Sequence, residues 1–89
     1  MAQLKYKRKQ GVILQEVMQQ NLLCDLELGL FGELNEFGVD IWNQLEQPAD
    51  IDEIIEKLKE FYDIEQIEIR YEIDQFLKLL QSKGFIESE

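Results

Sequence analysis

The stretch Glu-Leu-Gly-Leu-Phe-Gly-Glu-Leu-Asn-Glu-Phe-Gly, residues 27–38, decides how this chain of 89 residues folds. It holds three of the five glycines of the chain, but their spacing matches neither the dinucleotide fingerprint nor a P-loop. Gly29 instead suits a tight connection with a positive φ, and Leu30–Leu34 has the pattern of a strand. Asn35 is a good N-cap for a following helix. The stretch therefore predicts a turn, a strand and a capped helix, and not a nucleotide site.

The residues before this stretch predict two more strands. Val12–Val17 has strand character, residues 18–21 can form a turn, and residues 22–26 can return as a second strand. With Leu30–Leu34 as the third strand, this half of the chain forms an antiparallel meander. Nothing in the third strand, such as a proline or a lysine, protects it from further pairing.

Three helices are predicted in the second half, where apolar residues recur three and four positions apart. The first helix is predicted to begin after the N-cap Asn35 and to end at Gln47-Pro48. The second begins with a capping box of Asp50 and Glu53. The third begins with the same pattern at Asp63 and Gln66 and ends at Gly84. The predicted core sides are Leu34, Gly38, Ile41, Trp42 and Leu45; Ile51, Ile54, Ile55, Leu58, Phe61 and Tyr62; and Ile69, Ile73, Phe76, Leu77 and Leu80. Gly38 on a buried face indicates the close approach of another element, and Phe85-Ile86 can fold back onto the core. The expected class is α+β and winged-helix-like, with a three-stranded antiparallel sheet followed by three helices.

The charge is unevenly distributed. Four of the nine basic residues lie in the first nine positions, and the other 80 residues carry five basic and 19 acidic residues. We expect residues 1–10 to form a flexible basic arm and residues 11–89 to form a single domain. The acidic domain should repel nucleic acid and anionic lipid. No apolar run reaches the roughly 18 residues of a membrane span, no secretory signal is present, and the lone Cys24 suits a reducing, cytoplasmic location.

Few residues suit catalysis or metal binding. The chain has no histidine, and its two serines lie near the end of the sequence without a partner base. The carboxylates are accounted for by helix caps and solvated faces, and no calcium loop is present. We therefore expect no enzyme activity, no cofactor and no metal site. The third strand can instead accept a peptide strand at an open edge, or it can be covered by the third helix or by a dimer partner.

Two segments resemble a known family. Residues 25–42, from Asp25 to Trp42, resemble the segment D-x-x-x-G-x-(Y/F)-x-x-L-N-x-x-(G/A)-x-x-(I/V)-W of PqqD-like proteins. Residues 73–86, Ile-x-x-Phe-Leu-x-x-Leu-x-x-x-Gly-Phe-Ile, resemble the ending V-x-x-F-L-x-x-L-x-x-x-G-L-I. The similarity extends over about residues 11–87.

This resemblance implies a stand-alone recognition element for ribosomally synthesised and modified peptides, possessing no catalytic activity of its own. Such an element binds the leader segment of a precursor peptide as a strand added to the third strand, against the third helix. It presents the precursor to tailoring enzymes, either a leader peptidase with a cyclase, as in lasso peptide biosynthesis, or a radical SAM enzyme. The alternative function is a winged-helix transcriptional regulator or a dimerisation module of a larger assembly.

The resemblance also implies the binding residues, carried over by position. The expected peptide-binding residues are Leu30, Phe31, Gly32, Glu33 and Leu34 in the strand, and Arg70, Ile73, Asp74 and Leu77 in the third helix. The opposite flank of that helix, with Glu72, Phe76 and Leu79, is the alternative contact surface. Family members commonly have a larger residue at position 32, so Gly32 can open space for a bulky leader side chain. A Gly32→Val substitution is then expected to cost little folding stability and to weaken peptide binding.

Overall fold

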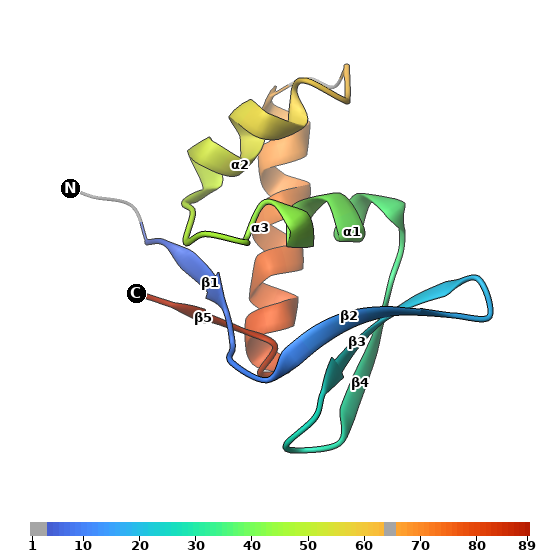
Figure 1. Cartoon of the computed structure of the whole chain (residues 1–89). Helices are drawn as coiled ribbons and strands as arrows, with labels where there is room; N and C mark the ends of the chain where they lie inside the picture. Colours follow the sequence, from blue (N-terminus) through green and yellow to red (C-terminus); the bar gives the residue numbers. More distant parts are fainter. Residues whose placement is uncertain (1–3, 64–65) are drawn as a thin grey trace.

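The computed structural model describes residues 4–63 and 66–89. Its elements are β1 (Tyr6–Arg8), β2 (Val12–Val17), β3 (Gln20–Asp25), β4 (Leu30–Leu34), α1 (Glu36–Asn43), α2 (Ile51–Leu58), α3 (Gln66–Ser82) and β5 (Ile86–Ser88). The strands β2, β3 and β4 form an antiparallel sheet in that order, and β1 pairs with β5 in a separate ribbon. Figure 1 shows α3 running behind α1 and α2, with the three-stranded sheet projecting to one side. The predicted α+β class, with three antiparallel strands followed by three helices, is confirmed.

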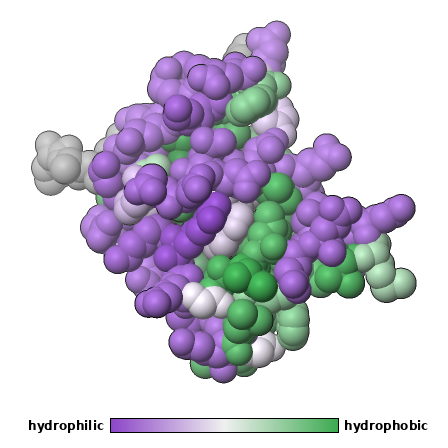
Figure 2. Space-filling view, in the orientation of Figure 1, coloured by the Kyte–Doolittle hydropathy of each residue, from purple (hydrophilic) through white to green (hydrophobic). Residues whose placement is uncertain are grey.

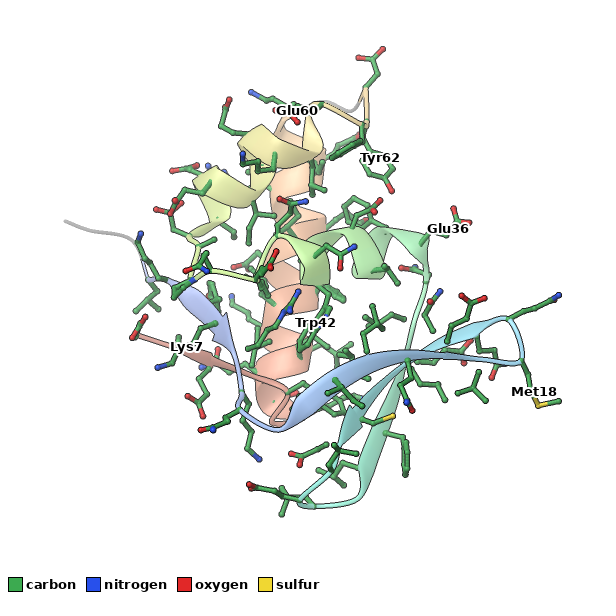
Figure 3. All side chains as sticks on the ribbon, in the orientation of Figure 1. Lys7, Met18, Glu36, Trp42, Glu60 and Tyr62 are labelled. Atoms are coloured by element: carbon green, nitrogen blue, oxygen red, sulfur yellow. The ribbon has the colours of Figure 1, made fainter. Side chains whose placement is uncertain are left out.

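The β2–β3 hairpin has a tighter turn than the sequence suggested. Met18 and Gln19 both have positive φ, 51° and 69°, as in the two-residue type I′ turn whose twist suits a hairpin. The strand β3 therefore begins at Gln20 and not at residue 22. Met18 points into solvent at the tip of this hairpin (Figure 3).

The β3–β4 turn is held by the carboxylate of Asp25. Its Oδ1 accepts hydrogen bonds from the backbone N–H of Glu27 at 3.0 Å and of Leu28 at 3.1 Å, and its Oδ2 accepts one from Lys9 Nζ at 2.8 Å. The bond from Lys9 and these backbone donors stabilise the ionised form, so they hold the pKa of Asp25 below its ordinary value. Gly29, with a φ of 68° as predicted, donates to the carbonyl of Asp25 at 2.8 Å. These bonds fix the point at which β4 begins.

The helix caps follow the sequence prediction where they are described. Asn35 Oδ1 accepts from Gly38 N–H at 2.8 Å, and Asp50 with Glu53 forms a reciprocal capping box. Gly84, with a φ of 82°, follows the end of α3. The capping predicted for the start of the third helix spans residues 64–65, which lie outside the described residues.

One core lies between the helices and the inner face of the sheet. Its buried members include most of the predicted apolar residues of the three helices and the returning Phe85 and Ile86, whereas Tyr62 and Phe76 are only partly buried. Phe61 was expected in this core but is 67% exposed. The reason is that α2 ends at Leu58, so the helical spacing no longer sets the direction of the Phe61 side chain.

The N-terminal residues differ from the expected flexible arm. Tyr6–Arg8 forms β1 and pairs with β5, and the Tyr6 side chain is buried. Arg8 donates from Nη2 to the carbonyl of Trp42 at 2.7 Å, and its guanidinium carbon lies 4.7 Å from the centroid of the indole ring. Figure 3 shows Trp42 below the α1 ribbon and to the right of β1. The ribbon therefore packs on the same core as the helices.

Candidate functional site: an open strand edge beside α3

The strand β4 occupies an edge of the three-stranded sheet. It pairs with β3 on one side, and no described residue pairs with it on the other. The strand β2 is the second edge, at the opposite side of the sheet. An unpaired edge presents backbone N–H and C=O groups that can bond to an added strand.

The hairpin register shows which groups of β4 face outward. A two-residue turn makes Val17 and Gln20 a hydrogen-bonded pair, and such pairs alternate along an antiparallel ladder. By this alternation the pair of Leu14 and Leu23 is not hydrogen-bonded. The N–H and C=O groups of Leu23 therefore point away from β2 and toward β4, where the partner of Leu23 is Gly32. The N–H and C=O groups of Phe31 and Glu33 therefore face the open edge.

A hollow of about 210 Å³ borders this edge. It is lined by Leu23, Gly32, Glu33, Leu34, Asn35, Phe76, Leu79, Leu80, Lys83 and Phe85. The lining is mostly apolar and joins β4 to one flank of α3. Leu79 is 54% exposed there, so the groove presents an apolar side chain to solvent. We call this surface the β4–α3 groove.

Gly32 forms part of the floor of the groove by packing against Phe85. A Cβ at position 32 would lie 2.9 Å from Phe85 Cε2 and 3.3 Å from Cζ. Phe85 is only 1% exposed, so its ring is closely packed and a shift of the ring would disturb buried neighbours. The expectation that Gly32→Val costs little stability is therefore wrong, because the ring of Phe85 already fills the space above the glycine.

At the other end of the groove, the ring of Phe76 packs against Gly38 of α1. A Cβ at Gly38 would lie 2.9 Å from Phe76 Cζ, so the glycine permits the close approach predicted from the sequence. Asn35, whose side chain caps α1, lines the groove at the same end. Phe76 is only partly buried and presents the rest of its ring to the groove.

The outer face of the sheet is also apolar. Phe31 is 68% exposed there, and Ile13 and Val17 are exposed on the same face by strand alternation. Cys24 lies on this face but is buried, as expected for a small hydrophobic side chain. Figure 2 shows hydrophobic side chains gathered over the sheet, while the rest of this view is mostly hydrophilic.

The helix residues predicted for the site fall into two groups. Ile73 and Leu77 are fully buried in the core. Arg70 and Asp74 line a different hollow of about 310 Å³, together with Ile51 and Tyr71. Of the predicted strand Leu30–Leu34, residues Gly32, Glu33 and Leu34 line the β4–α3 groove, whereas Leu30, Phe31, Arg70 and Asp74 do not.

Both charges on the Arg70 flank already have partners. Arg70 forms an ion pair with Asp52, and Asp74 Oδ2 lies 3.0 Å from Lys78 Nζ. The bond from Lys78 to Asp74 raises the pKa of the lysine above its ordinary value. By contrast, Leu79 and Phe76 on the opposite flank are open toward β4.

The groove residues missing from the predicted site are Leu23, Asn35, Leu80, Lys83 and Phe85, together with Phe76 and Leu79, which were expected only as the alternative contact surface. A sequence signal did exist for this flank, because Leu79 is apolar at a helix position where a polar residue is expected. Phe85 reaches the groove because the chain reverses direction after Gly84. No local sequence pattern indicates that this reversal places the Phe85 ring against Gly32.

Within residues 4–63 and 66–89, no three potential ligands of the His, Cys, Asp or Glu type gather to hold a metal ion. Tyr62 donates a hydrogen bond to the carboxylate of Asp40, which raises the pKa of the phenol, and its ring packs edge-on against Phe37. This group links helix α1 to the segment after α2 and lies outside the groove.

None of the described helices has both the length and the apolar character needed to cross a membrane.

A sheet edge open beside an apolar hollow is the geometry of domains that accept an added peptide strand. The sequence matches the family described as coenzyme PQQ synthesis protein D (PqqD) over residues 20–86, so the chain belongs to the PqqD family. No curated protein is similar enough in sequence to count as a match.

Two solved structures have the same fold. One is described as TbiB1 in complex with the TbiA(beta) leader peptide; it has a TM-score of 0.78 and 23% identity, and the match covers 91% of this chain and 94% of that chain. The other is described as lasso peptide synthetase B1 complexed with the leader peptide; it has a TM-score of 0.77 and 16% identity, covering 92% of this chain and 96% of that chain. The likeness of this chain to these two structures is one of overall fold.

Proposed function

We propose that this protein is a non-catalytic adaptor that binds the leader segment of a ribosomally synthesised precursor peptide. The leader adds as a strand to β4, and the adaptor presents the precursor to separate tailoring enzymes. The observation that carries this proposal is the open edge of β4 beside the apolar groove. Membership of the PqqD family and the leader peptides bound to both similar structures support it.

Backbone bonds would supply the part of the affinity that does not depend on sequence. Phe31 and Glu33 each direct one N–H and one C=O group outward, so an added strand can form up to about four hydrogen bonds with β4. The β2 edge is also unpaired, but no residue of β2 lines the groove. An added strand on β2 would therefore lack the apolar contacts that β4 offers.

The groove would supply the part of the affinity that depends on the sequence of the leader. Side chains on one face of the added strand would enter the hollow between Gly32 and Leu79, where they bury apolar surface. Ordering a flexible leader opposes this gain, so a dissociation constant on the order of micromolar or tighter is expected. We assign the helix contact to the flank with Phe76 and Leu79, in preference to the flank with Arg70 and Asp74.

The enzyme partners follow from the same class of relatives. A leader peptidase acting with a cyclase, in a lasso peptide pathway, is the leading candidate because one similar structure is a lasso peptide synthetase B1. A radical SAM enzyme is the other candidate. The precursor and the enzymes are to be sought by affinity capture with the full chain.

The charges of α3 disfavour the alternative of a DNA-binding regulator. Arg70 and Lys78, the two cations of α3, are both paired with acidic side chains, and Lys83, which follows the end of α3, is the nearby cation without a described ion pair. A recognition helix has to neutralise phosphates with its basic side chains. In α3 these basic side chains are already paired with acidic side chains of the same protein.

A matched pair of substitutions on α3 tests the proposal. Leu79→Asp places a charge in the groove, and Tyr71→Asp places the same charge on the opposite flank, where Tyr71 is similarly exposed. The binding of leader peptides, including the TbiA(beta) leader and further lasso leaders, is followed by amide NMR titration. We expect shifts at residues 30–34 and 76–83, and a loss of at least about tenfold in affinity for Leu79→Asp alone.

Two other outcomes would change the conclusion. A loss of affinity confined to Tyr71→Asp, with shifts around Arg70 and Asp74, would move the contact to that flank. No shift with any leader would reject the leader-binding proposal, and a stable dimer that covers β4 would then be sought by sedimentation.

A further inference from the structure

One end of the β4–α3 groove carries a single basic residue, Lys83. The other polar residues of the lining are Glu33 and Asn35. Asn35 is committed to capping α1 through its Oδ1 atom. Strand alternation places the Glu33 side chain with Phe31 on the outer face of the sheet, and no ion pair joins Glu33 to Lys83. Lys83 is thus the charged side chain available to a ligand in the groove.

The absence of a partner for Lys83 is unusual for this chain. Seven of the nine basic residues have a described partner: Lys5, Lys7, Arg8, Lys9, Lys59, Arg70 and Lys78. Among the residues that the structure describes, only Lys57 and Lys83 have none, although the chain has 19 acidic residues. Lys57 lies on α2 and is not part of the groove.

A lysine after the last turn of a helix is favoured by the helix dipole whatever its function. That preference accounts for a cation at this position in the chain, but it does not account for a cation that borders a mostly apolar groove and forms no described ion pair. A groove that binds a peptide strand gives the position a second role, because a bound carboxylate would supply the missing partner.

The geometry of the groove sets where such a carboxylate would lie. Phe76 marks one end, near Leu34 and Asn35. Lys83, the residue that follows α3, lies seven residues further along the chain, about 10 Å away along the direction of the helix axis. Residues on one face of an extended strand repeat about every 6.7 Å. The side chain that reaches Lys83 is therefore two or four residues from the side chain that contacts Phe76.

We propose that Lys83 makes this groove selective for peptide strands with an acidic side chain two or four residues from an apolar anchor. The inference rests on the proposed strand addition to β4 and specifies the ligand of that site. The strand β4 runs from the Lys83 end of the groove to the Phe76 end. An antiparallel ligand thus has its acidic residue C-terminal to the anchor, and a parallel ligand has it N-terminal.

A displayed library of random twelve-residue peptides provides the test. The library is selected against the full wild-type chain and against Lys83→Glu, with Lys57→Glu as the matched control because it makes the same charge change outside the groove. Wild type and Lys57→Glu should enrich Asp or Glu at a fixed spacing from an apolar residue. Lys83→Glu should lose this preference or enrich Lys or Arg at the same position.

The affinities of individual selected peptides then give the size of the effect of Lys83. Exchanging Glu for Lys in a selected peptide should weaken binding to the wild type by about five- to tenfold, and the exchanged peptide should bind Lys83→Glu better than the original does. The effect should shrink between low and high salt, because exposed charges are screened. Such a reversal is not explained by a role of Lys83 in helix stability, and thermal unfolding checks that both variants are folded.

The failures of the two proposals are distinguishable. Binders that shift the β4 amides but show no acidic preference, or the same preference in Lys83→Glu, would overturn the role of Lys83 and leave strand addition intact. If no selected peptide shifts the β4 amides, strand addition fails and this inference fails with it.

Discussion

Lys9 Nζ lies 2.8 Å from the Oδ2 atom of the buried Asp25 carboxylate, so the segment after β1 is tied to the turn that begins β4. The bond lowers the pKa of Asp25 and raises that of Lys9. A carboxyl group whose pKa is lower in the folded state stabilises the fold fully above its ordinary pKa of about 4. This contribution declines as the pH falls below that value and is lost below the lowered pKa.

The first prediction concerns this acid dependence. Asp25→Asn should lower stability at neutral pH and flatten the loss of stability between about pH 5 and pH 2, because the titrating group is gone. Urea unfolding followed across that range measures the effect. Glu60→Gln, which changes an exposed acid, is the control and should leave the slope unchanged. An unaltered acid slope in Asp25→Asn would assign the acid sensitivity to other carboxylates.

The second prediction concerns the contact of Gly32 with Phe85. Gly32→Val should destabilise the protein by about 1–3 kcal/mol, since the added side chain meets a buried ring that cannot move freely. Phe85→Leu should destabilise the wild type but cost less in the Gly32→Val background, where the smaller side chain relieves the overlap. Strictly additive free energies of unfolding in this double-mutant cycle would show that the two residues do not conflict.

The third prediction uses proline to separate the two sheet edges. Glu33→Pro removes an N–H group that faces the open edge of β4 and leaves the ladder to β3 intact, so it should weaken leader binding at least about tenfold with a limited cost in stability. Glu16→Pro is the matched control, because Glu16 opposes Asn21 and its N–H faces the open edge of β2. Calorimetric titration with a leader peptide compares the two. Equal losses, or a loss in Glu16→Pro alone, would place the ligand elsewhere.

The fourth prediction concerns Gly38 beneath Phe76. Alanine favours a helix over glycine by about 1 kcal/mol, which opposes the steric cost of a Cβ placed 2.9 Å from the Phe76 ring. Because Phe76 is only partly buried, its ring can move toward the groove, so Gly38→Ala should change stability little and weaken peptide binding. Phe76→Leu in the same background should recover part of the affinity. Unchanged binding by Gly38→Ala would show that the ring position does not matter to the ligand.

Local sequence patterns were sufficient for most of the fold. The strands Val12–Val17 and Leu30–Leu34 have the predicted bounds, and the capping box of Asp50 and Glu53 is formed as predicted. These features depend on neighbouring residues alone. The ribbon of β1 and β5 was missed because each strand has three residues and pairs with a segment about 80 residues away. Nothing local marks such short strands.

The candidate site could be predicted only in part for a related reason. The edge strand is visible in sequence, but the flank of α3 that faces it depends on how the helix rotates against the sheet. Both flanks mix polar and apolar residues, so a helical wheel does not separate Tyr71 from Leu79. The rotation is set by contacts between distant residues, such as Phe76 with Gly38 and Phe85 with Gly32.

The pairing of β1 with β5 brings Lys5 and Glu89 together, where their backbones exchange hydrogen bonds of 3.1 and 2.8 Å. In Figure 1 this ribbon lies across α3 from β4. A linker that follows Glu89 would therefore leave the molecule on the side away from the strand edge that we propose as the leader site. A circularly permuted chain, joined between these ends and reopened at the exposed Met18–Gln19 turn, should keep the β4–α3 groove intact. The same arrangement would allow the adaptor to be tethered to a tailoring enzyme through a linker after Glu89 without obstructing the precursor.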